Sequence, residues 1–492
     1  MLAAFVGLSA AREISIADFG AIASDPSVAT GQRNMAAANA ALGNASRGDT
    51  VLIPPGDWYT LGGIALRDRA GVTLRVEGTL HAIADFDAWP MADGGRRFAD
   101  ILSFSNCSDL VVTAGGTNGT IDGAGKKWWN KWVLDPLPAH RPTMLNVSSS
   151  DNTLVEGLRL KNAPNFHILL SDANGAEVRF VHISVDRSGM AAAKAVLRAK
   201  RQEAVAAAVA AAAAALLKSG GVAAVAAAAV GVGGGGVGGF PLQPEDLNTD
   251  GIDASGQNVW VHDVVIDNDD DSIAVKPCHA GSCRSACSQN MLFENLVLTG
   301  FGASIGSVPP TQPHPNCVRN ITFRNVSMPE TGKGIYVKSN PSCAFNASAG
   351  EARKTASITD VLFEDFRIVN PRWWAIWIGP QQQHEPGSAL SDKCAIDYPI
   401  SGACPTQGCV TFDNITLRNV LVEGTPWLSP GVVLGNASNP MTNIVFDNVT
   451  VTKPGGFPFL GEYKCESTFG LVTDSFPVPK CIRSSARVPG AK

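Results

Sequence analysis

Charged residues are scarce in this chain of 492 residues, at 17% against about 25% in an average globular protein. The formal net charge is −5, so no global basic field is available to hold a polyphosphate, and nucleic acid is not an expected partner. The hydrophobic content of 45% excludes wholesale disorder. Few charges combined with 50 Gly favour stacked strands and tight turns over a helical bundle.

A long, strongly apolar run is also missing. A membrane span needs about 20 such residues, whereas the nearest candidate, Ala204 to Leu217, is mostly weakly apolar alanine and is followed by Lys218. We therefore expect no membrane partner. The surrounding residues 189–239 hold 21 Ala and 10 Gly, which predicts a disordered or loosely helical low-complexity insert.

The cysteines predict a secreted, extracellular or cell-wall protein. All but Cys107 of the eleven lie after residue 277, and no paired CxxC supports zinc, so loop disulfides are expected and one thiol is left over. Ten Asn-x-Ser/Thr sequons point the same way. Residues 1–11 form a short apolar run that fits a brief signal segment.

A nine-residue pattern recurs outside the insert. An Asn, Asp or Glu is followed by apolar residues, and a second Asn, Asp, Gly or His lies five positions on, as in NTLVEGLRL (152), EVRFVHISV (177), NVWVHDVVI (258), NITFRNVSM (320) and NIVFDNVTV (443). The eight instances start 25, 81, 32, 30, 40, 54 and 29 residues apart. Subtracting the 51-residue insert from the interval of 81 leaves 30, so the insert is expected in a loop of an intact array.

Each unit is too small to bury its apolar face alone and must stack on the next one. Short β-branched strands with Asn, Asp and Gly corners predict an all-β fold, a single-stranded right-handed parallel β-helix over residues 12–188 and 240–482, with a tail at 483–492. A β-sandwich is the alternative, but hairpin signals are scarce. Asn34 to Leu42 is expected to form a short helical cap over the first coil.

The most informative stretch is NTDGIDASGQNVWVHDVVIDNDDDSIAVK, residues 248–276. Because neighbouring coils lie about 4.8 Å apart, Asp250 and Asp270, 20 residues apart, are expected to stack on one face with Asp271 beside them. Lys338 would continue this face. One carboxyl could protonate a leaving oxygen while another activates water, with mutual repulsion raising one pKa.

Simpler interpretations stay open for these residues. The acidic run at 267–271 could be a solvated turn or a calcium loop, Asn248 a corner residue, and Lys338 a solvated side chain. His182 and His262 fall inside repeat strands, where a structural role is expected. The tryptophans 373, 374 and 377 could stack on sugars or fill a core.

The chain resembles glycoside hydrolase family 28, the polygalacturonase family. The resemblance rests on GTIDGAGKKWW (119–129), LKNAPNFHI (160–168), NTDGID (248–253), NDDDS (268–272), GFGASIGSV (300–308) and GIYVKSNP (334–341). It implies an inverting hydrolase acting on a pectic polysaccharide, in which Asp270 is the general acid, Asp250 and Asp271 activate the water, and Asn248 and Lys338 contact substrate. It implies no cofactor and no metal, and we expect a monomer.

Two positions depart from the family pattern. Phe301 stands where Gly-His-Gly has its histidine, and Tyr336 where Arg-apolar-Lys has its arginine. Loss of the arginine weakens the expected clamp on a galacturonate carboxylate, so the leaving-side sugar is predicted to be neutral, such as rhamnose, with Phe301 and Tyr336 stacking on it. Two other functions stay open, a non-catalytic pectin-binding β-helix and a calcium-dependent pectate lyase.

Overall fold

The computed structural model describes residues 11–484, apart from 135–136, 189, 191–247, 279–282, 311–315, 341–355, 383–393, 395–397, 399–402, 425–429 and 456–460. The predicted insert at 189–239, apart from Met190, and most of the expected signal segment and tail lie outside the described residues. Among the helices of the described ranges, none has the length and apolar character to cross a membrane.

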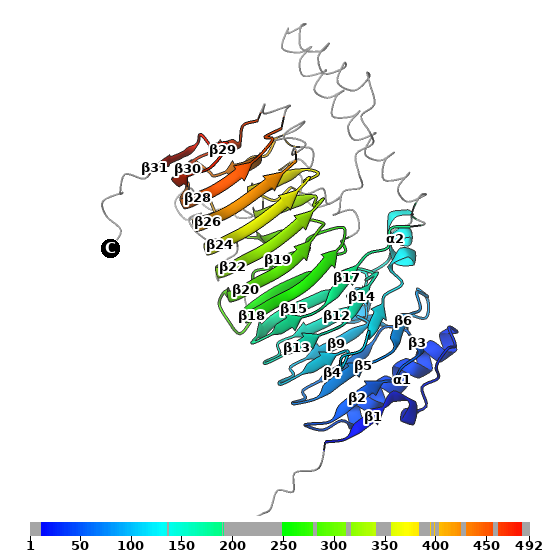
Figure 1. Ribbon diagram of the computed structural model, residues 1–492. Coiled ribbons are helices and arrows are strands. Elements are labelled where there is room, and N and C mark those ends of the chain that lie inside the picture. The colour runs from blue at the N-terminus through cyan, green and yellow to red at the C-terminus, as the bar shows by residue number, and fades with distance from the viewer. Residues whose placement is uncertain are drawn as a thin grey trace, which may run out of the picture.

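The described chain is a right-handed parallel β-helix, as predicted, with a 29-stranded sheet whose pairings are all parallel (Figure 1). Its N-terminal strands are β1 (Glu13–Ser15), β2 (Thr50–Ile53), β3 (Asp57–Thr60), β4 (Ile64–Arg67), β5 (Thr73–Val76), β6 (Thr79–Ala82), β9 (Leu102–Ser105), β10 (Val111–Thr113), β11 (Thr120–Asp122), β12 (Leu145–Ser148), β13 (Leu154–Glu156), β14 (Arg159–Lys161), β15 (Ile168–Asn174), β16 (Glu177–Arg179) and β17 (His182–Ser184).

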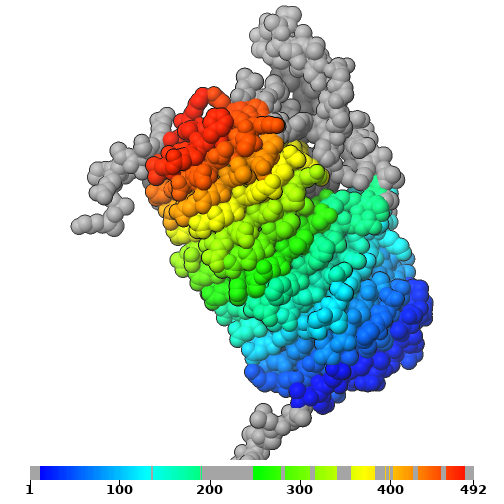
Figure 2. Space-filling model, viewed as in Figure 1, coloured from blue at the N-terminus to red at the C-terminus, as the bar shows by residue number. Residues whose placement is uncertain are grey.

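The strands that follow the insert are mostly longer. They are β18 (Ile252–Asp267), β19 (Ile273–Val275), β20 (Ser288–Leu298), β21 (Ala303–Val308), β22 (Asn316–Pro329), β23 (Lys333–Ser339), β24 (Ala356–Val369), β25 (Trp374–Pro380), β26 (Val410–Glu423), β27 (Gly431–Leu434), β28 (Met441–Val451), β29 (Lys464–Glu466), β30 (Thr468–Thr473) and β31 (Ile482–Ser484). In Figure 2 the colours cross the molecule in successive bands, because each coil lies directly on the previous one.

The nine-residue pattern corresponds to the coil. Its two polar positions are corners with positive φ, such as Asn290 (57°) and Asn295 (56°), where the short amide side chain tolerates the left-handed conformation. Corners of neighbouring coils are joined, as where Asn320 Nδ2 donates to Asn290 Oδ1 at 2.8 Å. One predicted alignment is wrong: Leu154 pairs with Glu177, so the coil spacing there is 23 residues and the EVRF instance begins two residues late.

The apolar positions between the corners fill the interior. Phe293, Phe323 and Phe363 on β20, β22 and β24 are buried and stack on one another, with ring centroids 4.5 and 5.3 Å apart. Each coil therefore continues the core of the coil before it, which is why alternation in sequence translates into one continuous core.

The helices lie at the edge of the stack. α1 (Val28–Asn44) contains the predicted cap, is longer at both ends, and begins where the Ser27 side chain accepts a hydrogen bond from the Thr30 amide. It packs on β3 and β4 at the N-terminal end of the core. The sequence analysis missed α2 (Gly125–Leu134), whose Trp128 and Trp129 are fully buried. Two short 3-10 helices, η1 (Ile16–Phe19) and η2 (Asp93–Gly95), and the hairpin of β7 (Met91–Ala92) and β8 (Arg97–Phe98), complete the described elements.

The expected loop disulfides are present. The described pairs are Cys278–Cys283, Cys287–Cys317, Cys394–Cys404 and Cys465–Cys481, and Cys409 is also disulfide-bonded. Cys107 is a free, buried thiol, which is the leftover cysteine that the odd count requires.

Candidate active site

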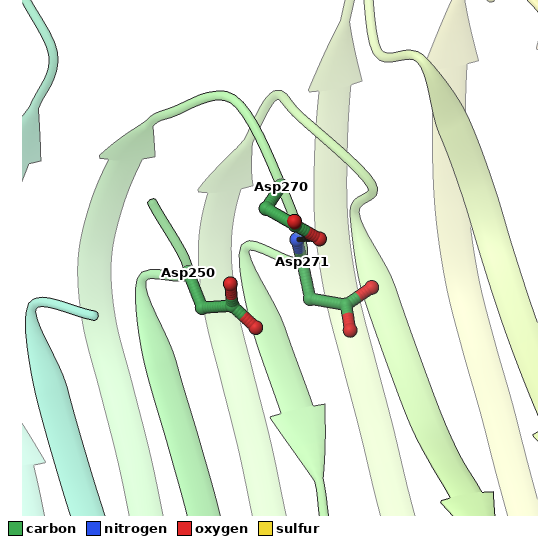
Figure 3. Close-up of side chains that lie close together, drawn as sticks. All are labelled: Asp250, Asp270 and Asp271. Atoms are coloured by element: carbon green, nitrogen blue, oxygen red, sulfur yellow. Dashed lines mark hydrogen bonds between the residues drawn. The ribbon is translucent and has the colours of Figure 1, made fainter. Parts of the chain in front are cut away.

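Three carboxylates meet just before the strands of two adjacent coils. Asp250 precedes β18, and Asp270 and Asp271 precede β19; one oxygen from each of the three lies within 4.8 Å of the others (Figure 3). The structure thus brings the predicted acids together. The expected stacking differs in detail, because Ile252 pairs with Ile273 and the offset of 21 residues places Asp271, not Asp270, over Asp250.

The turn that carries Asp270 and Asp271 is shaped by Asn268. Its buried side-chain amide donates to the carbonyl oxygens of Thr249, Asp270 and Asp271 at 2.9, 3.1 and 3.0 Å. The Asp271 amide in turn donates to Asp270 Oδ1 at 2.7 Å. A side chain that satisfies three carbonyls fixes both acids against the neighbouring coil.

Two lysines neutralise the acids. Lys276 Nζ lies 3.7 Å from Asp250 Oδ2 and 3.5 Å from both Asp253 Oδ2 and Asp271 Oδ2. Lys338 Nζ lies 2.7 Å from Asp271 Oδ2. Continuing the pairing by one residue places Lys276 and Lys338 in one column across the coils. Their ammonium groups therefore lie side by side next to the acids.

The surroundings shift the pKa values of Asp250, Asp253 and Asp271 in different directions. Burial, and then the charges of Asp253 and Asp271, raise the pKa of Asp250 well above its ordinary value against the opposing effect of the lysines. Burial raises the pKa of Asp253 to about 6. Burial would also raise that of Asp271, but Lys338, Lys276 and the hydroxyl of Ser304, which donates to Asp271 Oδ1 at 2.7 Å, hold its pKa below the ordinary range.

The sequence analysis missed several members of this cluster. Asp253 is 2% exposed and lies beside Lys276. It stands between two core residues of β18, so the alternation of the strand could have predicted that its side chain faces outward. His167 Nδ1 lies 3.1 Å from the Asp250 carbonyl oxygen, and burial lowers its pKa to about 4. Arg141 is buried against the Trp132 ring, and its charge acts on Asp250 and Asp270.

The predicted substrate residues lie differently from expectation. Asn248 is a half-buried corner residue with φ of 46°. Lys338 is 5% exposed and paired with Asp271. Phe301 and Tyr336 are 3% and 1% exposed and pack edge to face, with centroids 6.0 Å apart. Both rings lie inside a buried aromatic cluster, which leaves little of their surface for the sugar stacking predicted from the sequence.

The surroundings of the tryptophans and of His262 are those expected for structural roles. Trp373, Trp374 and Trp377 are at most 2% exposed and belong to the same aromatic cluster as Tyr336. His262 is held between Asp263 and Glu177, at 2.7 and 3.2 Å. His182 lies exposed on β17.

The three carboxylates could in principle hold a cation, since each offers an oxygen within 4.8 Å of the others. The lysines oppose this. Lys338 Nζ already lies at hydrogen-bond distance from Asp271 Oδ2, and Lys276 Nζ approaches both Asp250 and Asp271, so a divalent ion would face two ammonium charges. The arrangement is better suited to acid–base chemistry, in which one carboxyl holds a proton while an ionised neighbour polarises water.

A family model described as "Glycosyl hydrolases family 28" matches residues 46–198 and 241–379, more than half of the chain. The chain is 22% identical over 424 residues to an exopolygalacturonase of Cochliobolus carbonum, with 85% of this chain and 77% of the relative covered. It is 25% identical over 334 residues to endo-xylogalacturonan hydrolase A of Aspergillus tubingensis, with 67% of this chain and 63% of that relative covered.

Solved structures share the fold. The endo-xylogalacturonan hydrolase of Aspergillus tubingensis superposes with a TM-score of 0.60 at 20% identity, covering 94% of this chain and 98% of that one. The polygalacturonase of Erwinia carotovora gives 0.59 at 20% identity, covering 94% and 96%. Both likenesses extend over nearly the whole β-helix.

Proposed function

Because the chain belongs to glycoside hydrolase family 28, we propose that it hydrolyses α-glycosidic bonds in the backbone of a pectic polysaccharide. The observation that carries this proposal is the meeting of Asp250, Asp270 and Asp271, with one oxygen of each within 4.8 Å of the others; the surroundings raise the pKa of Asp250 and lower that of Asp271. The named activities of the relatives, exopolygalacturonase and endo-xylogalacturonan hydrolase, support a galacturonate-containing substrate.

In the proposed mechanism Asp270 protonates the leaving oxygen, and Asp271 with Asp250 activates water. The lowered pKa of Asp271 supports its role as a base, because Lys338 and Ser304 keep it ionised. The raised pKa of Asp250 favours a second division of roles, in which Asp250 carries the proton. General acid–base catalysis contributes about 10²–10⁴-fold in rate, so removing the acid is expected to have an effect of that size.

An activated substrate shows whether Asp270 or Asp250 donates the proton. We expect Asp270→Asn to lose at least about 10²-fold on a pectic polymer and to recover on an aryl galacturonide, whose leaving group needs no protonation. Asp271→Asn is expected to be inactive on both. If Asp250→Asn is rescued and Asp270→Asn is not, the roles are exchanged. Full activity of Asp270→Asn on polymer would falsify the acid assignment.

The stereochemical course is proposed from the family resemblance as inversion. Inverting enzymes commonly hold their carboxyl groups about 6.5–9.5 Å apart, and retaining enzymes about 5–5.5 Å. The nearest oxygens here lie within 4.8 Å, which is a distance between closest atoms, so it does not distinguish the two mechanisms. Proton NMR of the first product formed decides the question: inversion requires the β-anomer to appear before mutarotation.

We propose that the leaving-side sugar is neutral, such as rhamnose, for a reason of charge. Tyr336 replaces the arginine of the family pattern, and Lys338 is already engaged by Asp271, so little positive charge is available there for a uronate. The test compares initial rates on polygalacturonate, xylogalacturonan and rhamnogalacturonan. Equal or faster turnover of polygalacturonate would overturn this part of the proposal while leaving the hydrolase intact.

The two other functions are distinguished by simple assays. A pectate lyase generates an unsaturated product that absorbs in the ultraviolet and loses activity with a calcium chelator; a hydrolase releases reducing ends with neither property. A non-catalytic binder retains pectin in affinity gels and releases nothing. Lys276 and Lys338 beside the acids count against the calcium site that a lyase needs.

We further propose that residues 12–188 and 240–482 form one domain with 189–239 as an insert, and that the protein is secreted and monomeric. The direct pairing of His182 with Val265 supports continuity of the coils on either side of the insert. The disulfides, from Cys278–Cys283 to Cys465–Cys481, support an oxidising compartment. Sedimentation of the purified protein tests the monomer.

A further inference from the structure

Lys333 is a buried lysine surrounded by aromatic rings. It is 2% exposed, and its Nζ lies 4.3 Å from the ring centroid of Phe301 and 4.1 Å from that of Tyr336. The rings of Trp374 and Trp377 follow at 5.4 and 5.9 Å. All four distances are within the range of cation–π attraction, which is strongest where the cation is removed from water.

The coil register explains why these residues meet. Lys333 pairs with Trp374, and Tyr336 pairs with Trp377. Extending the pairing of Ala303 with Ile335 by two residues places Phe301 in the coil before Lys333. Asp271 occupies the same column one further coil back, because Ile273 pairs with Ala303. The aromatic cage is therefore the direct continuation, coil by coil, of the acid cluster.

Tyr336 connects the cage to the acids. Its ring centroid lies 4.4 Å from Lys338 Nζ as well as 4.1 Å from Lys333 Nζ. Lys338 Nζ is in turn 2.7 Å from Asp271 Oδ2. Ser304, which pairs with Tyr336 across the coils, donates to the other carboxylate oxygen of Asp271. A displacement of the Tyr336 ring would therefore act directly on Lys338, the cation nearest to Asp271.

The two departures from the family pattern are the two rings nearest to Lys333. A histidine or an arginine at these positions would bring a cation, or a strong donor, against a buried ammonium, which is unfavourable without water. Phe301 and Tyr336 instead offer ring faces to it. We propose that Phe301, Tyr336 and Lys333 form one positioning unit that replaces the usual histidine and arginine and holds Lys338 against Asp271. The positioning role rests on the proposed hydrolase function; the existence of the unit does not.

A stability cycle tests the unit without any substrate. We expect Tyr336→Arg to lower the apparent Tm by several degrees, because a guanidinium meets the Lys333 ammonium, and to lower it much less in the Lys333→Met background. Equal losses in both backgrounds would refute the coupling. Should Tyr336→Arg yield no folded protein, Tyr336→Leu replaces it, and the expected result is then a double variant less destabilised than the sum of the single ones.

A pH profile tests the positioning role. The ionisable and hydroxyl groups that face Asp271 are Lys338, Lys276, Ser304, Asp250, Asp253 and Asp270. If the unit holds Lys338 in place, Lys333→Met lowers kcat by about tenfold or more with little change in KM. It also moves the acidic limb of the kcat/KM profile to higher pH, because Lys338 then stabilises the ionised form of Asp271 less well.

The controls separate positioning from general damage. Compared with Lys333→Met, Lys333→Arg is expected to have a higher kcat and an acidic limb closer to that of the unaltered protein. Lys453→Met, at an exposed lysine, is expected to change neither kcat nor the acidic limb. Reduced activity without movement of the limb would overturn the positioning role and leave a structural one. If the unaltered protein releases no reducing sugar from any pectic polymer, the proposed function and the positioning role both fail, while the stability cycle still decides whether the unit exists.

Discussion

Lys276 is the residue on which the charge balance of the site depends most. One ammonium lies within 3.7 Å of three buried carboxylates. Burial alone would lower its pKa, but the four neighbouring acids raise it, so this lysine is charged at neutral pH. Its charge is what allows so many acids to be packed together.

We therefore predict that Lys276→Met is destabilising and changes the pH response. Breaking a buried ion pair on one side costs about 3–5 kcal/mol, because the carboxylates keep their burial and lose their cation. The free energy of unfolding by denaturant measures the loss, and the acidic limb of activity should move to higher pH as the pKa values of Asp250 and Asp271 rise. Lys127→Met, at an exposed lysine on α2, is the control; a similar loss in both variants would contradict the prediction.

Asp253 gives a pH dependence of stability with a definite sign. Its pKa is raised to about 6, so the folded state holds a proton that the unfolded chain has already lost. Stability from this residue is complete below about pH 4 and falls as pH rises through about 6, by on the order of 3 kcal/mol. We expect the stability difference between unaltered protein and Asp253→Asn to decrease over this interval, as followed by denaturant unfolding. A constant difference from pH 4 to 7 would show that Asp253 is not perturbed.

At this scale the sequence allowed part of the site to be predicted. Asp250, Asp270 and Asp271 were found because the coil spacing relates positions about 20 residues apart, and the structure does bring them together. Lys276 and Lys333 were missed because a lysine that pairs with buried acids, or one that lies among aromatic rings, looks like any other lysine in a sequence. The stacking role predicted for Phe301 and Tyr336 took no account of the neighbouring coil, which adds Trp374 and Trp377 to the same buried cluster.

At the scale of the element, the corner asparagines decide where the long strands bend, and Asn419 is such a corner inside β26. Asn419 has φ of 53°, donates to Asp365 Oδ1 at 2.9 Å and accepts from Asn448 Nδ2 at 3.0 Å. It thus combines a left-handed backbone with a place in a ladder of side chains. The two contributions are separable because glycine keeps the first and loses the second.

We predict that Asn419→Ala destabilises more than Asn419→Gly. Alanine loses the ladder and also pays about 1–2 kcal/mol for the left-handed conformation, whereas glycine loses the ladder alone, about 0.5–1.5 kcal/mol per hydrogen bond. Denaturant midpoints at constant m-value give the comparison. Were alanine the milder substitution, the backbone conformation would not be what selects asparagine at the corners.

Elements were predictable where the pattern is strict and not where it is interrupted. The units starting at 258, 290, 320, 360, 414 and 443 correspond to coils, and their predicted spacings agree with the pairing of β18, β20, β22, β24, β26 and β28. The EVRF instance was misplaced by two residues because Gly175 serves as its first corner and glycine was not allowed at that position. α2 was missed because its buried tryptophans were assigned to a family motif.

At the scale of the whole molecule, the stack is continuous across the insert. β17 precedes residues 189–239 and β18 follows them, yet the two strands pair directly. The family match also omits residues 199–240. We predict that deleting 199–240 leaves the apparent Tm within a few degrees and retains hydrolysis of the preferred polymer, as measured by calorimetry and reducing-end release. A deletion variant that folds but is inactive would assign the insert a part in catalysis.

The architecture as a whole was the most predictable feature. A unit that cannot bury its own apolar face admits few solutions besides stacking, so the repeat alone was sufficient to indicate the β-helix. What repetition does not encode is the content of each coil's outward positions. These hold the acids in one coil and aromatic rings in the next, and they obey no period.

The position of the acids in the stack determines how the site responds when the protein loses structure from its ends. In a one-dimensional array, loss of order starts at the two ends and advances inward coil by coil. β18 and β19 have many coils on either side, so amide exchange should be slowest around the reactive carboxylates and fastest at β1 and β31. Proteolysis or unfolding of the terminal coils would therefore shorten the ordered β-helix well before it affected the activity.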